Sequence, residues 1–282
     1  LKKHDHIASM TGDGVNDAMA LKSADIGVAM GITGTDVAKN SSDMILTDDN
    51  FATIVSAVEE GRIIYSNIRK FVGFLLSCNV GEILVIFLIS LIPASLIPGI
   101  ATPLTAIQLL WLNLVTDSFP ALALGREKGE PDIMKQPPRK KSESIINTPM
   151  KISILVQSLA IFAAVFTAFV LGLTVFFKDA ASPIEGARTM AFATLILAEL
   201  FRAYGARSER ISVFKLGVFS NKYMNISVAG SIGLLMAVIY IPGLNSIFDN
   251  IMLAPVYWIP IILLAFIPFA ASEIFKLIKN RK

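Results

Sequence analysis

The pattern of hydrophobic and polar positions changes near residue 50. In residues 1–50, short apolar runs alternate with turns rich in glycine and aspartate. Beyond residue 50, apolar residues recur at spacings of three and four and then extend into long apolar stretches. The first pattern is typical of short strands and helices, whereas the second predicts long helices. The sequence therefore predicts a small α/β segment followed by a mainly helical one.

The first segment has the element order of a parallel sheet with crossover helices. The expected strands are residues 7–10, 26–30 and 44–47, and the expected helices are residues 16–23 and 35–41. Fifty residues are too few for an independent domain of this kind. The chain opens with leucine and has no charged-then-apolar leader, so we expect no signal peptide. We expect a carboxyl-terminal fragment whose remaining strands lie upstream.

Six stretches of the second segment are expected to cross a membrane, which takes about 20 mostly apolar residues. Five of them carry at most one charged residue over such a length. The sixth is interrupted by Glu199 and Arg202, but it lies where a return crossing is needed. The expected spans are residues 71–92, 103–125, 152–177, 187–206, 223–243 and 254–276. The alternative is a large soluble protein with buried helices, which the charge-free run from Ile152 disfavours.

Composition and charge support this division. The chain is 54% hydrophobic and 17% charged, whereas a soluble domain carries about 25% charged residues. Residues 1–62 hold five basic and ten acidic side chains, and the rest of the chain is basic. The loops rich in lysine and arginine are 126–151, 202–222 and 276–282. Because basic loops stay in the cytoplasm, we expect an integral, multi-pass membrane protein with both ends cytoplasmic.

Residues 51–70 are expected to form a cytoplasmic stalk helix. No proline interrupts the chain from Phe51 until Pro93. If residues 51–92 form one helix, that helix is about 60 Å long. It would link the small sheet to the first membrane span without a hinge.

A turn rich in glycine and aspartate, Thr11–Asp17, follows the first expected strand. Ligands of open parallel sheets bind at the carboxyl ends of the strands. The carboxylates of Asp13 and Asp17, beside glycines that allow close backbone approach, suit Mg²⁺ next to a phosphate. The alternative is a turn that only caps the helix after it.

The second candidate site lies inside the expected membrane spans. Asn79 and Glu82 share one face of the first span, and Asn113, Thr116 and Asp117 share one face of the second. This set of oxygen ligands suits Ca²⁺ and lacks the thiolate or imidazole groups that softer metals prefer. The alternative is hydrogen bonding between helices, which explains two costly intramembrane carboxylates poorly.

Pro120 adds a further candidate ligand to the second span. Its ring has no N–H to bond the carbonyl of Thr116, so we expect that carbonyl to be free beside Asp117. Backbone broken in this way is tolerated at membrane depth where it lines an ion site.

These motifs resemble those of P-type cation-transporting ATPases, in the calcium-pump branch. The resemblance covers nearly the whole chain. Its most specific motifs are Thr11–Lys22, Gly27–Gly31, Thr47–Phe51, Val58–Arg62, Asn79–Glu82, Asn113–Asp117, Asp132–Met134 and Pro137–Arg139. The implied fold is mainly α, a six-helix transmembrane bundle preceded by the last part of an α/β haloacid-dehalogenase-like phosphorylation domain. The implied divisions are residues 1–50 for that domain, 51–70 for the stalk and 71–282 for the membrane.

The resemblance also implies functional residues. Asp13 would bind the catalytic Mg²⁺, and Asn16 and Asp17 would order the phosphate site. Glu199 matches a position where some calcium pumps supply a cation ligand, although Arg202, one turn on, offers an ion pair instead.

The implied function is ATP-driven transport of a cation, Ca²⁺ first, through a phosphoenzyme cycle. Mg²⁺ with ATP is the implied cofactor, and Ca²⁺ is the transported ion. Membrane lipid and the preceding part of the same polypeptide are implied partners, and no nucleic acid is expected. The membrane is the plasma membrane if the source is prokaryotic. Because no Asp-Lys-Thr-Gly phosphorylation motif is present, we expect the fragment alone to be inactive.

Three alternatives remain open. One is a P-type pump for Na⁺, H⁺ or Mg²⁺, although Asn113 disfavours the first two by the family pattern. Another is a channel or secondary transporter, which would have no use for the loop Thr11–Asp17. The third is a soluble phosphatase of the same superfamily fused to an anchor, which the intramembrane carboxylates disfavour.

Overall fold

The computed structural model describes residues 6–93, 95–97, 100–139 and 143–279, and it is mainly helical. The chain divides into two compact units. One comprises Leu1–Tyr65 and Gly129–Ser144, and the other comprises Ser66–Lys128 and Ile145–Lys282. The longest helix, α3 (Phe51–Ser90), contributes residues to both units. Each unit is described by itself below.

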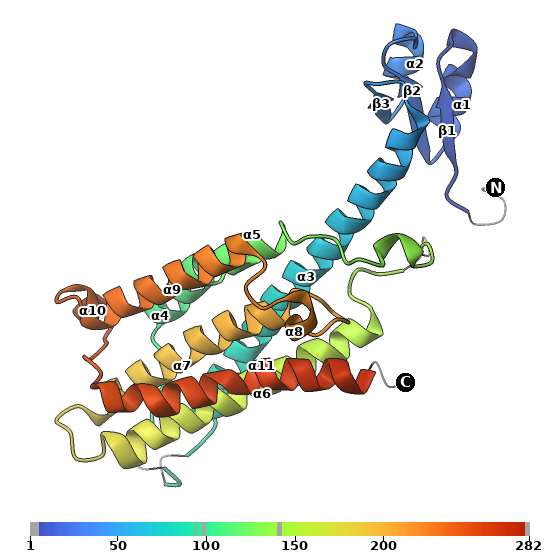
Figure 1. The fold of residues 1–282 in the computed structure, drawn as a ribbon. Helices are drawn as coiled ribbons and strands as arrows, with labels where there is room; N and C mark the ends of the chain where they lie inside the picture. The colour runs from blue at the N-terminus through green and yellow to red at the C-terminus, as the bar shows by residue number, and fades with distance from the viewer. Residues whose placement is uncertain (1–5, 94, 98–99, 140–142, 280–282) are drawn as a thin grey trace. The chain divides into compact units, whose positions relative to one another are not determined.

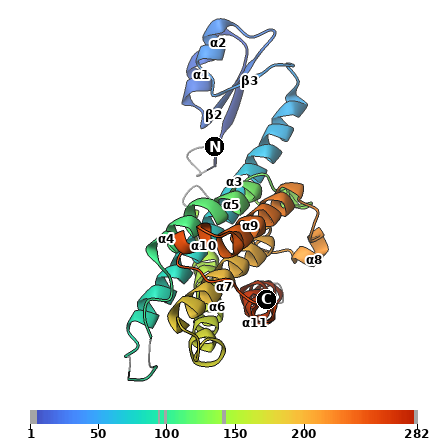
Figure 2. The same ribbon diagram turned by 90° about the vertical axis from the view of Figure 1, so that its left-hand side faces the viewer.

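The first unit contains a three-stranded parallel sheet in the order β1-β2-β3 (Figure 2). The strands pair in parallel with Ser9 opposite Ile26 and Val28 opposite Met44. Its elements are β1 (Ser9–Gly12), the 3-10 helix η2 (Val15–Asp17), α1 (Ala18–Ser23), β2 (Ile26–Met30), α2 (Asp36–Asn40) and β3 (Met44–Leu46). The expected order of strands and crossover helices is confirmed, with the first strand placed two residues later than predicted.

The two faces of this sheet are covered by different helices. On one face, Ala29 packs with Leu21 of α1 and Ala38 of α2. On the other face, Val28, Met30 and Leu46 form a cluster against which Ile54 of α3 packs. Because successive residues of a strand point to opposite faces, a short run of buried residues in β2 serves both small cores.

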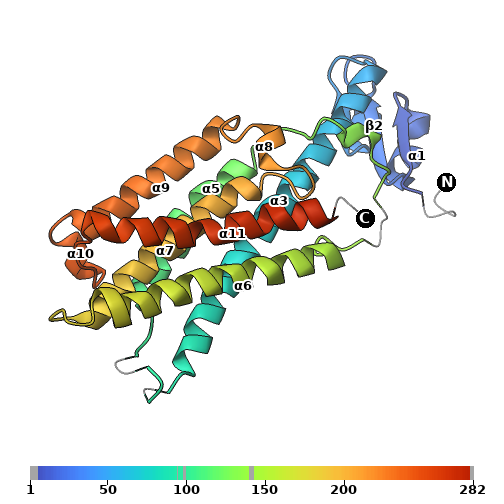
Figure 3. The ribbon, with the colours of Figure 1, turned by 60° about the horizontal axis from the view of Figure 1, so that its bottom comes forward.

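The second unit is a bundle of long helices, of which α6, α7 and α11 run side by side (Figures 1 and 3). Two π-helical turns, η3 and η5, interrupt or end long helices. The elements after α3 are α4 (Ala106–Trp111), η3 (Leu112–Thr116), α5 (Ser118–Leu124), the 3-10 helix η4 (Ile133–Lys135, in the first unit), α6 (Thr148–Leu171), η5 (Gly172–Phe176), α7 (Pro183–Gly205), α8 (Val213–Leu216), α9 (Lys222–Tyr240), α10 (Leu244–Ile247), the 3-10 helix η6 (Pro255–Tyr257) and α11 (Trp258–Lys279).

Among the described residues, five helical segments are long and apolar enough to cross a membrane. They are Phe51–Ser90, Ala106–Leu124, Thr148–Phe176, Lys222–Tyr240 and Pro255–Lys279. These segments correspond to five of the six expected spans. The unbroken helix expected over residues 51–92 is also found, because α3 runs from Phe51 to Ser90.

The helix α7 corresponds to the remaining expected span, 187–206, but it is not among the five. It packs against α6, α9 and α11, and most of its residues are buried, including Glu199 and Arg202. A helix surrounded by other helices has little surface facing lipid, so it can carry polar residues that a lipid-facing helix cannot. The sixth span therefore stays a prediction, and the burial of α7 is compatible with it.

Candidate functional site

Three buried carboxylates come together inside the second unit. Glu82 on α3, Asp117 after η3 and Glu199 on α7 are 5%, 1% and 1% exposed. One oxygen of Asp117, one oxygen of Glu199 and the Sγ atom of Cys78 all lie within 4.8 Å of one another. Three segments far apart in the sequence therefore contribute acidic groups to the interior of one bundle.

These carboxylates have few hydrogen-bond donors around them. Glu82 Oε1, both carboxylate oxygens of Asp117 and both of Glu199 have no partner among the described residues. An ionised carboxylate that is buried without a partner is very costly. The cluster is therefore stable only when protons or a cation neutralise it, and a divalent cation neutralises two carboxylates at once.

The π turn η3 places the polar residues of the second span. The N–H of Asp117 bonds the carbonyl of Leu112 at 3.0 Å, five residues back, which widens the helix by one residue. Asn113 Nδ2 donates to Glu82 Oε2 at 2.6 Å and so joins the second span to α3. Thr116 is buried, and its hydroxyl donates to the carbonyl of Leu112 at 2.9 Å.

Asn79 is not brought into this cluster. Its side chain is exposed, and Nδ2 donates to the carbonyl of Leu75 at 3.0 Å. Cys78 faces the cluster instead, and it is fully buried. The reason is helical geometry, because residues four apart lie about 40° from each other around an α-helix and residues three apart about 60°. The i, i+4 spacing of Cys78 and Glu82 is the signal that would have identified this cysteine.

Arg202 does not form the ion pair with Glu199 that the sequence left open. Its Nη1 atom donates to the carbonyl of Phe74 at 3.2 Å, and its Nη2 atom donates to the carbonyl of Gly73 at 3.3 Å. The guanidinium also lies 5.3 Å from the centroid of the Phe74 ring. Both carboxylate oxygens of Glu199 are left without a donor, which favours a role as cation ligand.

The expectation of a free carbonyl at Thr116 is wrong. Pro120 does remove the helical N–H that would bond this carbonyl, but the hydroxyl of Ser231 on α9 donates to it at 3.3 Å. A buried acceptor is normally satisfied by whichever donor packs nearby. The donor comes from a helix more than a hundred residues further along the chain, so the local sequence could not indicate it.

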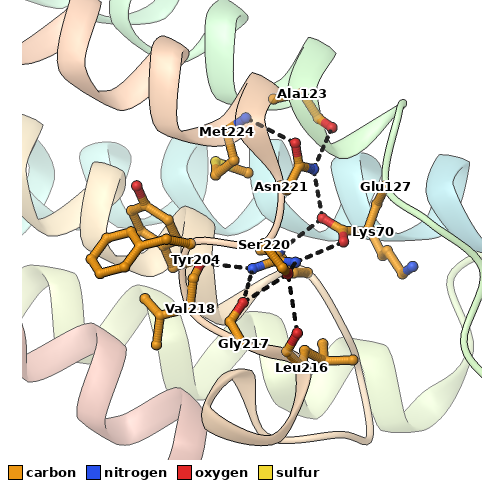
Figure 4. A network of polar contacts seen from close by, with 12 residues as sticks. Lys70, Ala123, Glu127, Tyr204, Leu216, Gly217, Val218, Ser220, Asn221 and Met224 are labelled. Atoms are coloured by element: carbon orange, nitrogen blue, oxygen red, sulfur yellow. Dashed lines mark hydrogen bonds and ion pairs between the residues drawn. The ribbon is translucent and has the colours of Figure 1, made fainter.

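A buried ion pair between Arg207 and Glu127 joins the ends of several helices (Figure 4). Arg207, after α7, binds the Glu127 carboxylate with Nε at 2.8 Å and Nη2 at 2.9 Å. Asn221 Nδ2 donates to Glu127 at 2.7 Å, and Asn221 Oδ1 caps α9 by accepting from the Met224 amide at 3.0 Å. This network joins the chain after α5 to the end of α7 and the start of α9. No sequence pattern near Glu127 or Arg207 indicates it.

In the first unit, the loop Thr11–Asp17 lies at the carboxyl end of β1. Oδ2 of Asp17 accepts the backbone N–H groups of Asp13 at 3.1 Å and Gly14 at 3.0 Å. A Cβ atom at Gly12 would lie 2.5 Å from the Cβ of Asp17, so this close approach requires glycine. The side chains of Asp13 and Asn16 are exposed. The loop therefore uses Asp17 for its own shape and presents Asp13 and Asn16 to solvent.

Asp49 is a second organising carboxylate, which the sequence analysis missed. Its Oδ1 atom accepts the N–H groups of Gly31 at 2.6 Å and Ile32 at 2.9 Å, and Oδ2 accepts the N–H of Thr33 at 2.7 Å. The hydrogen bond from Ile32, followed by those from Thr33 and Gly31, lowers the pKa of Asp49 to about 2. This carboxylate ties the loop after β2 to the end of β3.

Taken together, long apolar helices and a cluster of buried carboxylates are typical of a membrane protein that handles cations. Residues 101–278 match the family described as cation transporting ATPase, C-terminus. The chain therefore belongs to the cation-transporting ATPase family, and it is an integral membrane protein. The predicted resemblance to P-type pumps of the calcium branch is confirmed.

Curated relatives agree with this assignment. The chain is 43% identical over 291 residues to "Calcium-transporting ATPase 1" of Bacillus cereus, covering 99% of this chain and 32% of that protein. It is 46% identical over 267 residues to "Calcium-transporting ATPase" of Bacillus subtilis, covering 95% of this chain and 29% of that protein. It is 42% identical over 252 residues to the human "Calcium-transporting ATPase type 2C member 1", covering 89% of this chain and 26% of that protein. The chain thus spans about a third or less of the length of these relatives.

Proposed function

We propose that this chain is part of a P-type ATPase that transports Ca²⁺ across a membrane through a phosphoenzyme cycle. The observation that carries the proposal is the cluster of Glu82, Asp117 and Glu199, whose buried oxygens lack donors. The names of the relatives support Ca²⁺ as the transported ion. In this account the preceding part of the polypeptide supplies the nucleotide site and the phosphorylated aspartate.

The cation ligands are proposed to come from three helical segments. Asp117 and Glu199 provide oxygens that are already close together, and Glu82 accepts a hydrogen bond from Asn113, which lies one helical turn before Asp117. Thr116 adds a hydroxyl beside Asp117. Ca²⁺ takes six to eight oxygen ligands, so water or further backbone oxygens complete the shell. Asn79 would join only if its side chain turned away from the carbonyl of Leu75.

Asp13 is proposed to hold Mg²⁺ at the phosphorylation site. Its exposed carboxylate follows a parallel strand, and the neighbouring Asp17 carboxylate is occupied by loop amides. The residues therefore fit a hard cation bound through one carboxylate and water. When bound, Mg²⁺ would neutralise charge on the transferred phosphoryl group. Asp17 fixes the loop, and Asn16 presents an amide next to it.

The proposed membrane arrangement has six spans, with α7 as the sixth, and both chain ends in the cytoplasm. The loops rich in lysine and arginine support this orientation. Residues 1–50 are proposed to be the end of a haloacid-dehalogenase-like phosphorylation domain, residues 51–70 the stalk and residues 71–282 the membrane domain. The helix α3 carries Glu82, and only four residues separate its start from the end of β3, so it is the proposed route between phosphorylation and ion binding.

The test is Asp117→Asn in the full-length protein. The substitution keeps size and hydrogen bonding but removes one of the charges that a cation would neutralise. We expect loss of calcium-activated phosphorylation from ATP, while phosphorylation from inorganic phosphate, which needs no bound calcium in this family, persists. Gln157→Asn, a buried polar change on α6 away from the cluster, is the control. Unaltered calcium activation in Asp117→Asn would remove the proposed cation site.

A further inference from the structure

Cys78 adds a sulfur atom to the oxygen ligands that the sequence predicts for the carboxylate cluster. Its side chain is fully buried, and its Sγ atom lies within 4.8 Å of one oxygen of Asp117 and one oxygen of Glu199. Those two oxygens are also within 4.8 Å of each other. Because Ca²⁺ is a hard cation that takes oxygen ligands, the thiol has no role in the calcium site proposed above.

The two carboxylates beside this thiol are available to a ligand. Asp117 and Glu199 are each 1% exposed, and none of their four carboxylate oxygens has a hydrogen-bond partner among the described residues. A buried ionised carboxylate without a partner is costly, so a bound cation would stabilise both groups. The thiol therefore adjoins two acceptors that point to a cation, unlike a cysteine packed in an apolar core.

The groups around the sulfur atom also suit a cation. Arg202 Nη1 donates to Cys78 Sγ at 3.8 Å, and outer-shell donors of this kind hold a metal ligand in place. Glu82 lies one turn beyond Cys78 on α3, and its Oε2 atom accepts from Asn113. Three carboxylates and one guanidinium thus surround the thiol, and the excess of negative charge favours a divalent cation.

One thiolate and two carboxylates form a ligand set for a soft or borderline divalent cation. In proteins Zn²⁺ is bound by cysteine sulfur and by aspartate or glutamate oxygen, often by three protein ligands with water in the fourth position. Thiolates select such metals, whereas carboxylates alone suit Ca²⁺ and Mg²⁺. Coordination replaces the proton of the thiol, which passes to water.

We propose that Cys78 makes this cluster a site for thiophilic divalent cations, Zn²⁺ and Cd²⁺, which bind Cys78, Asp117 and Glu199 in competition with Ca²⁺. The inference rests on the proposed calcium function, because it assigns the same two carboxylates to both kinds of cation. It adds a residue that decides which cations the site accepts. Binding of Ca²⁺ requires the carboxylates, whereas tight binding of Cd²⁺ requires the thiol as well.

The test measures Cd²⁺ binding to the full-length protein in detergent without ATP. Two signals are recorded, the ultraviolet charge-transfer absorption of a sulfur–cadmium bond and the displacement of radioactive Ca²⁺. We expect the absorption in the wild type, and we expect excess Ca²⁺ to remove it. The difference between the wild type and Cys78→Ser isolates this cysteine from cysteines elsewhere in the protein.

Cys78→Ser replaces the thiol by a hydroxyl of similar size. It should weaken Cd²⁺ binding by at least about tenfold, the size of effect found when even an outer-shell partner of a metal is lost. It should leave the affinity for Ca²⁺ unchanged, which also shows that the variant is folded. Equal Cd²⁺ affinity in Cys78→Ser and the wild type, or an equal loss of affinity for Cd²⁺ and Ca²⁺, would overturn the proposal.

A matched control places a thiol outside the cluster. Thr167 is exposed on α6, and its hydroxyl donates to the carbonyl of Ala163 at 2.7 Å. The double variant Cys78→Ser with Thr167→Cys should bind Cd²⁺ as weakly as Cys78→Ser does. Restored Cd²⁺ binding would show that a thiol anywhere in the bundle is enough, and the proposal would be wrong.

Asp117→Asn separates this proposal from the calcium site, because it should weaken the binding of both cations. Unaltered Ca²⁺ binding in Asp117→Asn, together with loss of the Cd²⁺ signal in Cys78→Ser, would contradict the calcium site but not the thiol ligand. Weakened Ca²⁺ binding in Asp117→Asn, together with unaltered Cd²⁺ binding in Cys78→Ser, would contradict the thiol ligand alone.

Discussion

Replacing Arg207 by methionine should destabilise the helical unit strongly. Arg207 is 2% exposed and Glu127 is 7% exposed, so the substitution leaves a carboxylate buried without its main partner. The side chain also donates to the carbonyls of Gly217 at 2.8 Å and Val218 at 2.7 Å, which would lose these donors. Removing one partner of a buried ion pair typically costs about 3–5 kcal/mol in the free energy of unfolding.

A loss of this size is measurable as a fall in melting temperature. At about 2–4 °C per kcal/mol for a protein of this size, Arg207→Met should lower the Tm by about 10 °C in tryptophan-fluorescence melts of detergent-solubilised protein. The matched control is Arg126→Met, because Arg126 is exposed and its guanidinium stacks on Tyr223 at 5.1 Å. That control should shift the Tm by no more than a few degrees.

The double variant Arg207→Met with Glu127→Leu separates the two contributions. If the uncompensated carboxylate causes the loss, the double variant should be more stable than Arg207→Met alone. A Tm for Arg207→Met equal to that of Arg126→Met would refute the reasoning, because the network in Figure 4 would then contribute nothing measurable.

Two further predictions concern the first unit. The Asp49 carboxylate has a pKa lowered to about 2, so its stabilisation is complete above the unfolded pKa of about 4 and is lost as pH falls toward 2. The protection factor of the Ile32 amide, which compares its exchange rate with that of an unstructured peptide at the same pH, should therefore fall below pH 4 in the wild type, whereas Asp49→Asn should show low protection at every pH; strong protection in the variant would contradict this. Gly12→Ala should abolish Mg²⁺-dependent phosphorylation of the full-length protein because its Cβ would displace Asp17. Gly61→Ala should retain it, because the added Cβ would meet no atom within 4 Å apart from the backbone of its own helix.

Local periodicity was sufficient to predict the main elements. The short apolar runs of residues 1–50 predicted the strands. The two helices between them predicted that the strands are parallel, because crossover connections leave few other topologies. The absence of proline between Phe51 and Pro93 was enough to predict α3 as one helix. A helix was also expected near residues 187–206 despite Glu199 and Arg202, and α7 is found there, although its crossing of the membrane stays a prediction. Neighbouring helices bury both of these side chains.

The candidate site was less predictable, because it depends on helix rotation and on contacts between distant segments. A rotation of one position decides that Cys78 faces the carboxylates and Asn79 does not. The Ser231 hydroxyl that donates a hydrogen bond to the Thr116 carbonyl comes from another helix. The partner of Glu127 is likewise 80 residues away. Nothing in the sequence near either residue indicates such a partner.

The most direct test of the account is an equilibrium Ca²⁺-binding isotherm on the full-length protein without ATP. Glu82→Gln, Asp117→Asn and Glu199→Gln should each lower the affinity for Ca²⁺ at least tenfold, because each removes a buried charge that the cation neutralises. Glu185→Gln, the same change at a half-buried carboxylate in the first turn of α7, should bind as the wild type does. Wild-type affinity in all three cluster variants would contradict the central claim that these carboxylates hold the transported ion.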